Sequence, residues 1–151
     1  MIRRRVPAWA AALLGAAAFA CGPAGPRPIA LGAEECRHCH MTVSDPRFAA
    51  ELVTRKGKIF VFDDVGCLAT FAAAGPVPPE QVEGVWVTDV RRPGTLIPAQ
   101  DAMYLRTDSV RTPMGSHLVA VPREAADSLR AALGGDLLDW GAVLAQARAA
   151  T

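Results

Sequence analysis

Soft metal ligands gather in two short segments of this sequence. The first, residues 36–41, reads Cys-Arg-His-Cys-His-Met, and five of its six residues carry a sulfur atom or an imidazole. The second, residues 112–117, reads Thr-Pro-Met-Gly-Ser-His, and the two segments together hold all three histidines of the chain. Thiolates and thioethers select Cu(I), whereas thiolates with imidazoles also suit zinc. Because methionine is a poor zinc ligand, Met41 and Met114 shift the expectation towards copper.

A copper site of this kind suits a carrier. Cu(I) is held by as few as roughly two or three soft ligands, so such a site stays incomplete. A receiving protein can then add its own ligands before the donor releases the ion. A closed four-ligand zinc site does not exchange its metal so easily.

Other interpretations of the Cys-x-x-Cys pair remain open. A disulfide between Cys36 and Cys39 would be the resting state in an oxidising compartment and would need reduction before Cu(I) binds. A thiol–disulfide oxidoreductase would use the same pair, although the thioredoxin motif opens a helix and this one precedes the first predicted strand. A structural zinc site would use Cys36, Cys39 and Cys67. Cys67 itself either faces the core or completes the metal site.

The N-terminus has the pattern of an export signal. Arg3, Arg4 and Arg5 precede 15 uncharged residues, 6–20, which is short of the ~20 that span a bilayer as a helix. Residues 1–20 are therefore predicted to be a signal peptide. The following Cys21 and its Gly/Pro-rich neighbours resemble a bacterial lipobox, which predicts lipidation of Cys21 and a flexible tether over residues 21–34. We expect anchoring on the periplasmic side of a bacterial membrane, and the absence of Asp at position 22 favours the outer membrane.

Composition excludes several classes of protein. The chain has 151 residues, of which 51% are hydrophobic and 21% charged, so it is too apolar for a long disordered protein. Four cysteines are too few for a disulfide-dense mini-protein. The balance of 16 Lys+Arg against 15 Asp+Glu gives no indication of a nucleic-acid partner. No phosphate loop, Ser-His-Asp set or nucleotide fingerprint is visible, so we expect no catalytic residues and no enzymatic activity.

The elements that must position the ligands form two similar halves. Six strands are predicted, at residues 48–54, 58–62, 85–90, 102–106, 118–121 and 137–138. One helix is expected to begin at Asp63-Asp64 and end at Gly75, a second to run from Pro122 to Gly134, and a third over residues 140–150. The repeated order predicts an α+β fold of two tandem ββαβ units, residues 35–96 and 97–151, joined near residues 93–98. Each unit is too small to be stable alone, so we expect the two to pack together.

The order of these motifs resembles the NosL family. The resemblance rests on the lipobox Cys21, Cys36-x-x-Cys39-x-Met41, the run Phe62-Asp63-Asp64-Val65-Gly66-Cys67, and Thr112-Pro113-Met114-Gly115-Ser116. Members of that family are membrane-anchored copper lipoproteins associated with maturation of nitrous oxide reductase. The resemblance implies a periplasmic Cu(I)-binding protein that delivers copper to the reductase, with a membrane transporter complex as a further partner. It also implies a fold of two ββαβ domains related to the organomercurial lyase core.

The resemblance implies a set of metal-site candidates. Carried over by position, these are Cys36, Cys39, Met41 and Met114, of which Cys39 and Met114 are the principal ones. His117 joins them on chemistry, because it lies just beyond the matched Met-Gly motif. His40 stands where the family's Cys-Gly-Met has a small residue, and it either adds a ligand or faces solvent. Cu(I) is the expected ion, with zinc as the alternative.

Overall fold

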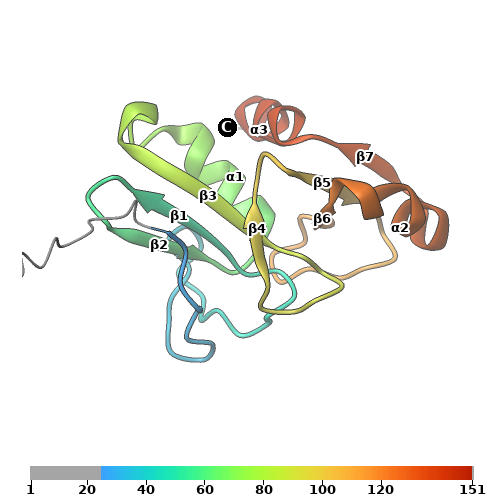
Figure 1. Cartoon of the computed structure of the whole chain (residues 1–151), viewed down its shortest axis with the longest axis horizontal. Coiled ribbons are helices and arrows are strands. Elements are labelled where there is room, and N and C mark those ends of the chain that lie inside the picture. The colour runs from blue at the N-terminus through green and yellow to red at the C-terminus, as the bar shows by residue number, and fades with distance from the viewer. Residues whose placement is uncertain (1–24, 151) are drawn as a thin grey trace, which may run out of the picture.

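A computed structural model describes residues 25–150 of the chain (Figure 1). The predicted signal peptide and the predicted lipidation at Cys21 lie outside the described residues. Among the described helices, none has the length and apolar character needed to cross a membrane. The elements follow in the order β1 Ala50–Thr54, β2 Ile59–Phe62, α1 Val65–Ala74, η1 Pro79–Gln81, β3 Val82–Thr88, β4 Leu96–Pro98, β5 Ala102–Arg106, β6 Leu118–Pro122, η2 Arg123–Ala125, α2 Ala126–Leu133, β7 Asp136–Leu138 and α3 Trp140–Ala149.

The first half of the chain forms a four-stranded antiparallel sheet in the order β2-β1-β3-β4. Both faces of its central strand β1 are buried. On one face Phe60 and Phe62 of β2 pack against Phe71 of α1, with ring centroids 5.3 and 5.2 Å apart. On the other face Glu51 accepts a hydrogen bond from the backbone N–H of Arg27, so the N-terminal segment covers that side. The sheet is thus the middle layer between α1 and the chain that leads to the Cys-x-x-Cys turn.

The second half forms a three-stranded antiparallel sheet in the order β6-β5-β7. Helix α2 packs against β5, and the closing helix α3 packs against α1 (Figure 1). Tyr104 of β5 stacks on Trp140 of α3 at 5.6 Å and donates its hydroxyl to the carbonyl of Ala99. These contacts attach the second sheet to the helix of the first half.

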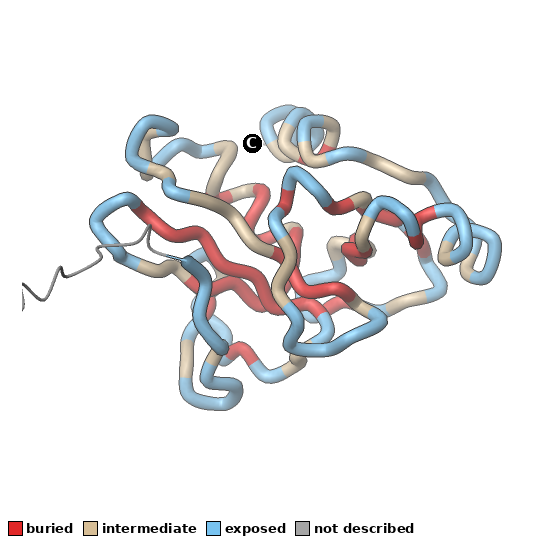
Figure 2. Tube along the Cα trace, in the orientation of Figure 1, coloured by how far each residue is buried: buried red, intermediate tan, exposed pale blue. Residues whose placement is uncertain are grey.

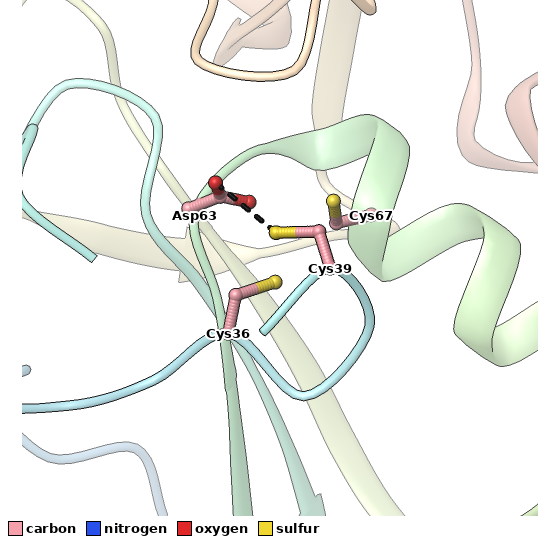
Figure 3. A group of neighbouring side chains, drawn as sticks. All are labelled: Cys36, Cys39, Asp63 and Cys67. Carbon is pink, nitrogen blue, oxygen red and sulfur yellow. Dashed lines mark hydrogen bonds between the residues drawn. The ribbon is translucent and has the colours of Figure 1, made fainter. Parts of the chain in front are cut away.

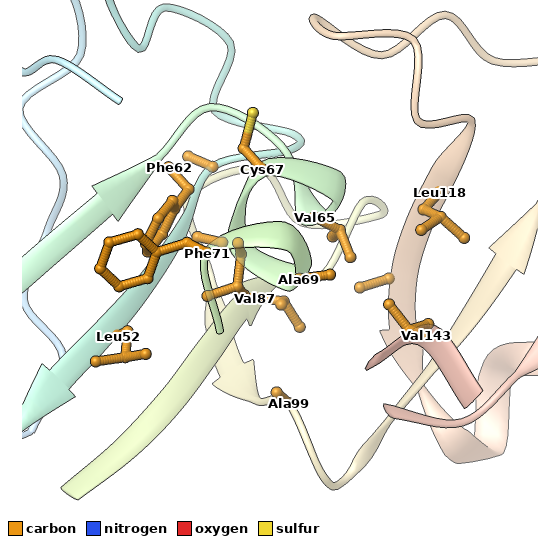
Figure 4. Close-up of a cluster of buried hydrophobic side chains, with 14 of the residues drawn as sticks. Leu52, Phe62, Val65, Cys67, Ala69, Phe71, Val87, Ala99, Leu118 and Val143 are labelled. Atoms are coloured by element: carbon orange, nitrogen blue, oxygen red, sulfur yellow. The ribbon is translucent and has the colours of Figure 1, made fainter. Parts of the chain in front are cut away.

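One continuous core joins the two halves. Figure 4 shows Val65 and Ala69 of α1 facing Leu118 of β6 and Val143 of α3, and all four belong to the same buried cluster. Figure 2 shows the buried chain concentrated in the strands and the inner helix face, with exposed loops around them. Two smaller clusters lie largely within the second half. Because the largest cluster draws on both halves, the two halves stabilise each other.

The predicted fold class is confirmed, with differences at the edges of elements. The helix α1 begins and ends where expected, because Asp64 caps its N-terminus and Gly75 adopts a left-handed conformation at its C-terminus. The strand predicted at 85–90 instead covers Val82–Thr88, because its first residues pair with β1. The segment predicted as a joint contains an additional strand, β4, which pairs with β3. A three-residue strand carries too little periodicity to be recognised from sequence.

Candidate metal site

The Cys-x-x-Cys motif forms a tight turn beside the end of β2. The backbone N–H of Cys36 donates to the carbonyl of Met41 at 2.8 Å, and that of His40 donates to the carbonyl of Cys36 at 3.0 Å. A bond from the N–H of Arg37 to the carbonyl of Val61, 2.8 Å long, fixes the turn to β2. Cys36 is fully buried, whereas Cys39 is half-buried. The turn therefore holds one thiol inside the protein and the other towards its surface.

Two consecutive aspartates connect β2 to α1, and their side chains make different contacts. Asp64 is the N-cap of the helix, and its Oδ1 accepts the N–H of Cys67 at 2.9 Å. Asp63 points the other way, and its Oδ2 accepts from the Sγ of Cys39 at 3.4 Å (Figure 3). Asp63 is only 3% exposed, yet its Oδ1 is buried without a hydrogen-bond partner. A buried polar atom without a partner costs about 1–3 kcal/mol, which a bound cation would offset.

Cys67 brings a third thiol from the first turn of α1. Its position three residues after the N-cap turns its side chain back towards the end of β2, and it is 3% exposed. Figure 3 shows Cys36, Cys39, Asp63 and Cys67 gathered from the turn, the strand end and the helix. All three cysteines are free thiols, and the helix N-terminus at which Cys67 lies favours negative charge.

The four side chains form a group that can hold a metal ion. One ligand atom from each of Cys36, Cys39, Asp63 and Cys67 lies within 4.8 Å of every other. Sulfur atoms bound to a tetrahedral zinc ion are about 3.8 Å apart, given a Zn–S bond of about 2.3 Å. Small side-chain shifts therefore close the group on an ion. The donor set of three thiols and one carboxylate suits a soft or borderline metal.

Hydrogen bonding and burial give the three thiols different pKa values. The Cys67 thiol donates to Cys36, and this bond, with three backbone N–H groups directed at the same sulfur, lowers the pKa of Cys36 to about 6. The same bond raises the pKa of Cys67 far above its ordinary value. Burial raises the pKa of Cys39 to about 11. The metal-free group therefore holds one thiolate and two thiols near neutral pH, and a metal must displace the remaining protons.

The second ligand segment, residues 112–117, lies directly against the start of α1. The backbone N–H of Met114 donates to Oδ2 of Asp64 at 3.2 Å, so the same carboxylate caps the helix and holds this loop. A Cβ atom on Gly66 would lie 2.5 Å from the Cβ of Ser116, so only glycine permits this close approach. Met114 is 49% exposed.

An open cleft of about 290 Å³ connects the metal group to solvent. It is lined by His38, Cys39, Asp64, Gly66, Cys67, Thr70, Met114 and Ser116. The thioether of Met114 and the half-buried thiol of Cys39 share this lining, while Cys36 lies deeper and outside it. The group therefore has an inner side closed by the sheet and an outer side that a ligand can approach.

The other predicted ligands lie apart from this group. Met41 is 59% exposed and lies outside the cleft lining. The Nδ1 of His40 lies 2.7 Å from Oε1 of Glu35, and both side chains are exposed. The Nδ1 of His117 lies 3.4 Å from Oδ1 of Asp108. The structure thus brings together Cys36, Cys39 and, at the mouth, Met114.

Sequence reasoning did not select two members of the site. In the sequence, Asp63 is one of two possible helix caps, and Cys67 fits either the core or the metal site. One signal was available for Asp63: a helix has one N-cap, so the second aspartate of an Asp-Asp pair needs another partner. His38, which is exposed and lines the cleft, gave no such signal.

Comparisons with known proteins identify the family and the fold of the chain. The NosL family model matches residues 28–147. This chain belongs to the NosL family. Its fold is similar to the crystal structure of the copper chaperone NosL from Shewanella denitrificans, with a TM-score of 0.61 and 22% sequence identity over 77% of this chain and 96% of that one. No curated protein matches the chain.

His40 occupies a special backbone conformation in the turn of this NosL chain. That residue has φ of 63°, in the left-handed region that a small residue such as glycine adopts at least cost. Histidine is one of the side chains enriched there among non-glycine residues. Its bond to Glu35 places the imidazole on the outer surface of the turn.

Proposed function

We propose that this chain is a copper chaperone that holds Cu(I) between the Cys-x-x-Cys turn and α1. One observation supports this most strongly: three free thiols and a buried carboxylate converge behind an open cleft that carries a methionine thioether. Thiolates and a thioether are the donors that Cu(I) prefers. The relative from Shewanella denitrificans is itself described as a copper chaperone.

The depth of each ligand gives the proposed order of events. Cys39 and Met114 meet an incoming ion first, because both line the open cleft and are partly exposed, whereas Cys67 in the same lining is only 3% exposed. Cys36 and Cys67 then retain it on the buried side, where the orphaned Oδ1 of Asp63 also lies. Release follows the opposite order, because an acceptor can bind the exposed side of the ion before the buried thiolates dissociate from it.

A Cu(I) competition titration tests the proposal. The reduced protein is titrated with Cu(I) against a chromophoric Cu(I) chelator. We expect competition at micromolar chelator, and Cys39→Ser and Cys67→Ser variants should lose at least the 10–100-fold that removing an outer-shell partner costs a metal site. No competition, or parental affinity in both variants, would refute the assignment.

Methionine variants give a matched comparison. Met114→Leu removes the thioether at the cleft and should weaken Cu(I) binding. Met103→Leu removes a thioether on β5 whose sulfur contacts Arg123, and it should leave affinity unchanged. Equal affinity in the two variants would exclude Met114 from the site.

A zinc-stabilised interaction module is the second candidate, and Asp63 is the observation that favours it. Three cysteines and one carboxylate make the four ligands of a closed zinc site. The variant Asp63→Asn separates the two ions, because zinc accepts carboxylate oxygen whereas Cu(I) depends on sulfur. Under the copper proposal this variant changes Cu(I) affinity little. If the protein is a zinc module, the Asp63→Asn variant should instead lose zinc, and the parent protein should unfold when a chelator removes the metal.

A thiol–disulfide oxidoreductase is less well supported by the geometry. Its attacking thiolate must be accessible, yet Cys36, whose pKa is the lowered one, is fully buried. The Cys-x-x-Cys pair also occupies a turn, while it is Cys67 that opens the helix.

The location and client of the chaperone complete the proposal. We place the protein on the periplasmic side of a bacterial membrane, anchored through lipid on Cys21, with copper passing to nitrous oxide reductase through its transporter complex. Metabolic labelling with a fatty acid, compared between the parent and Cys21→Ser, tests the anchor. Copper content of nitrous oxide reductase in cells with and without this chain tests the client.

A further inference from the structure

The turn between β1 and β2 carries a cluster of cations, which we name the hairpin tip. It consists of Arg55, Lys56 and Lys58, all exposed. Many other arginines of the described chain are paired with carboxylates, as Arg27 is with Glu34 and Arg47 with Asp45. Within residues 25–150, none of the three hairpin-tip side chains forms an ion pair with a carboxylate. The positive charge of the tip is therefore not neutralised by neighbouring carboxylates.

A cleft of about 420 Å³ lies beside these cations. Its apolar lining comes from Phe60, Pro76 and Val77, and its polar lining includes all three hairpin-tip cations with Thr54, Glu80 and Gln81. The Nζ of Lys58 lies 4.6 Å from the centre of the Phe60 ring, which holds this ammonium over the apolar lining. Glu80 is the one acidic side chain that the lining contains. The cleft thus combines excess positive charge with an apolar surface.

The N-terminal chain meets the sheet at a point from which the predicted anchor can reach the hairpin tip. The N–H of Arg27 donates to Glu51, the second residue of β1 and four residues before Arg55. At about 3.3 Å per residue the hairpin tip is about 13 Å further along the strand. The six residues from Cys21 to Arg27 can span at most about 20 Å. A lipid on Cys21 would keep the hairpin tip within reach of the bilayer surface.

We propose that the hairpin tip and its cleft dock on the surface of an anionic phospholipid membrane. The cations bind headgroup phosphates, and Phe60, Pro76 and Val77 accept the apolar part of the interface. This contact is independent of copper binding and adds a second membrane attachment to the predicted anchor. Binding of such a surface to a membrane strengthens with its apolar area and with its electrostatic attraction to anionic lipids.

Docking through the hairpin tip would direct the metal group away from the bilayer. Lys58 and Asp63 lie at opposite ends of β2, about 17 Å apart along the strand. The cleft that opens on Cys39 and Met114 belongs to the Asp63 end. A membrane at the hairpin tip therefore leaves that cleft accessible to an acceptor protein.

Vesicle sedimentation of the unlipidated protein tests this docking. The first described strand begins at Ala50 and the first residue packed against the core is Ile29, so a chain of residues 21–151 with Cys21→Ser should keep the fold. We expect it to sediment with phosphatidylglycerol–phosphatidylcholine vesicles and not with pure phosphatidylcholine. Removing all three charges in Arg55→Gln/Lys56→Gln/Lys58→Gln should lower the partition coefficient about 100-fold at low salt.

A matched triple variant controls for net charge. Arg111→Gln/Arg123→Gln/Arg148→Gln removes the same charge from the second half of the chain and should leave binding within about twofold. Thermal unfolding checks that both variants are folded. Equal loss in the two variants, or sedimentation of the parent that ignores lipid charge, would overturn the proposal.

Competition with inorganic phosphate distinguishes binding to a lipid surface from binding to a free anion. Inorganic phosphate and sodium chloride are compared at equal ionic strength. We expect equal displacement from the vesicles, because both act by screening. Stronger displacement by phosphate would assign the cleft to a free anion and overturn the membrane proposal.

Discussion

The contact between Gly66 and Ser116 should couple the stability of the fold to metal binding. Gly66→Ala places a Cβ 2.5 Å from the Cβ of Ser116, whereas carbon atoms in van der Waals contact lie about 3.5–4.0 Å apart. The start of α1 and the loop 112–117 must therefore separate by roughly 1 Å. Because Met114 is carried by this loop, the substitution should move its thioether away from the thiols.

The magnitude follows from two opposing effects. Overpacking of this kind costs about 1–3 kcal/mol. Alanine in place of glycine returns up to about 1 kcal/mol through its better helix propensity. We expect a net loss of about 1–2 kcal/mol in the free energy of unfolding, or about 2–8 °C in Tm for a chain of this size.

A double-mutant cycle isolates the contact. Ser116→Gly removes the closest of the atoms that the new methyl group would meet and leaves Asp64 Oδ1 at 3.1 Å, so Gly66→Ala should be much less destabilising in that background. Urea unfolding gives the coupling energy, and Cu(I) competition gives the affinity of each variant. Gly66→Ala should weaken Cu(I) binding in the parent and have little further effect when Met114 is already leucine.

Two results would refute this reasoning. If Gly66→Ala were equally destabilising with and without the Ser116 side chain, the clash would not be its cause. If stability fell while Cu(I) affinity stayed at the parental value, the position of Met114 would not matter to the metal.

Three further predictions concern charge and protons. Burial raises the pKa of Glu51, so the folded protein favours the protonated carboxyl, and the stability that this form contributes is lost as pH rises through the folded pKa. Glu51→Gln should therefore raise Tm at pH 7 and have little effect below the ordinary carboxyl pKa. Thermal scans at the two pH values measure both effects. Asp64→Ala removes the N-cap bond to Cys67 and should lower the unfolding free energy by about 1–2 kcal/mol, measured in urea, and an unchanged value would exclude the capping role. Cu(I) affinity should rise with pH between about 6 and 9, by up to about 100-fold per pH unit. The reason is that the ion displaces protons from the thiols of Cys39 and Cys67, whose pKa values are raised. A Cu(I) affinity that does not change with pH in the chelator assay would contradict thiolate ligation.

The sequence predicted local features well where one residue type decides the conformation. The limits of α1 were set by Asp64 and Gly75, because an aspartate caps free N–H groups and a glycine adopts a left-handed conformation at low cost. The strand β5 was predicted with its observed bounds, since residues 102–106 are strongly strand-forming. The strand β4 was not predicted, because its three residues are fixed by pairing with β3.

In the metal site, too, local features could be predicted from the sequence and features that depend on the folded chain could not. Spacing alone brought Cys36 and Cys39 together, because a turn of four residues places its first and last side chains close to each other. Met41 and His40 are in the same short segment, yet Met41 is 59% exposed and the imidazole of His40 is bonded to Glu35. The sequence could not give the direction of these side chains, which depends on how the turn is bonded to β2.

By itself, the sequence determined the chemical character of this protein: which soft ligands it holds, in which segments, and on what kind of α+β scaffold. Only the tertiary structure decided which of those ligands meet. Cys67 and Asp63 lie about 25–30 positions from the Cys-x-x-Cys turn, and Met114 lies about 50 beyond Asp64, so no local periodicity links them. They converge because β2 delivers Asp63 to the turn, the N-cap Asp64 orients the first turn of α1, and Gly66 lets the second half of the chain approach. Burial of one shared core fixes those distances, and a core is a property of the folded chain.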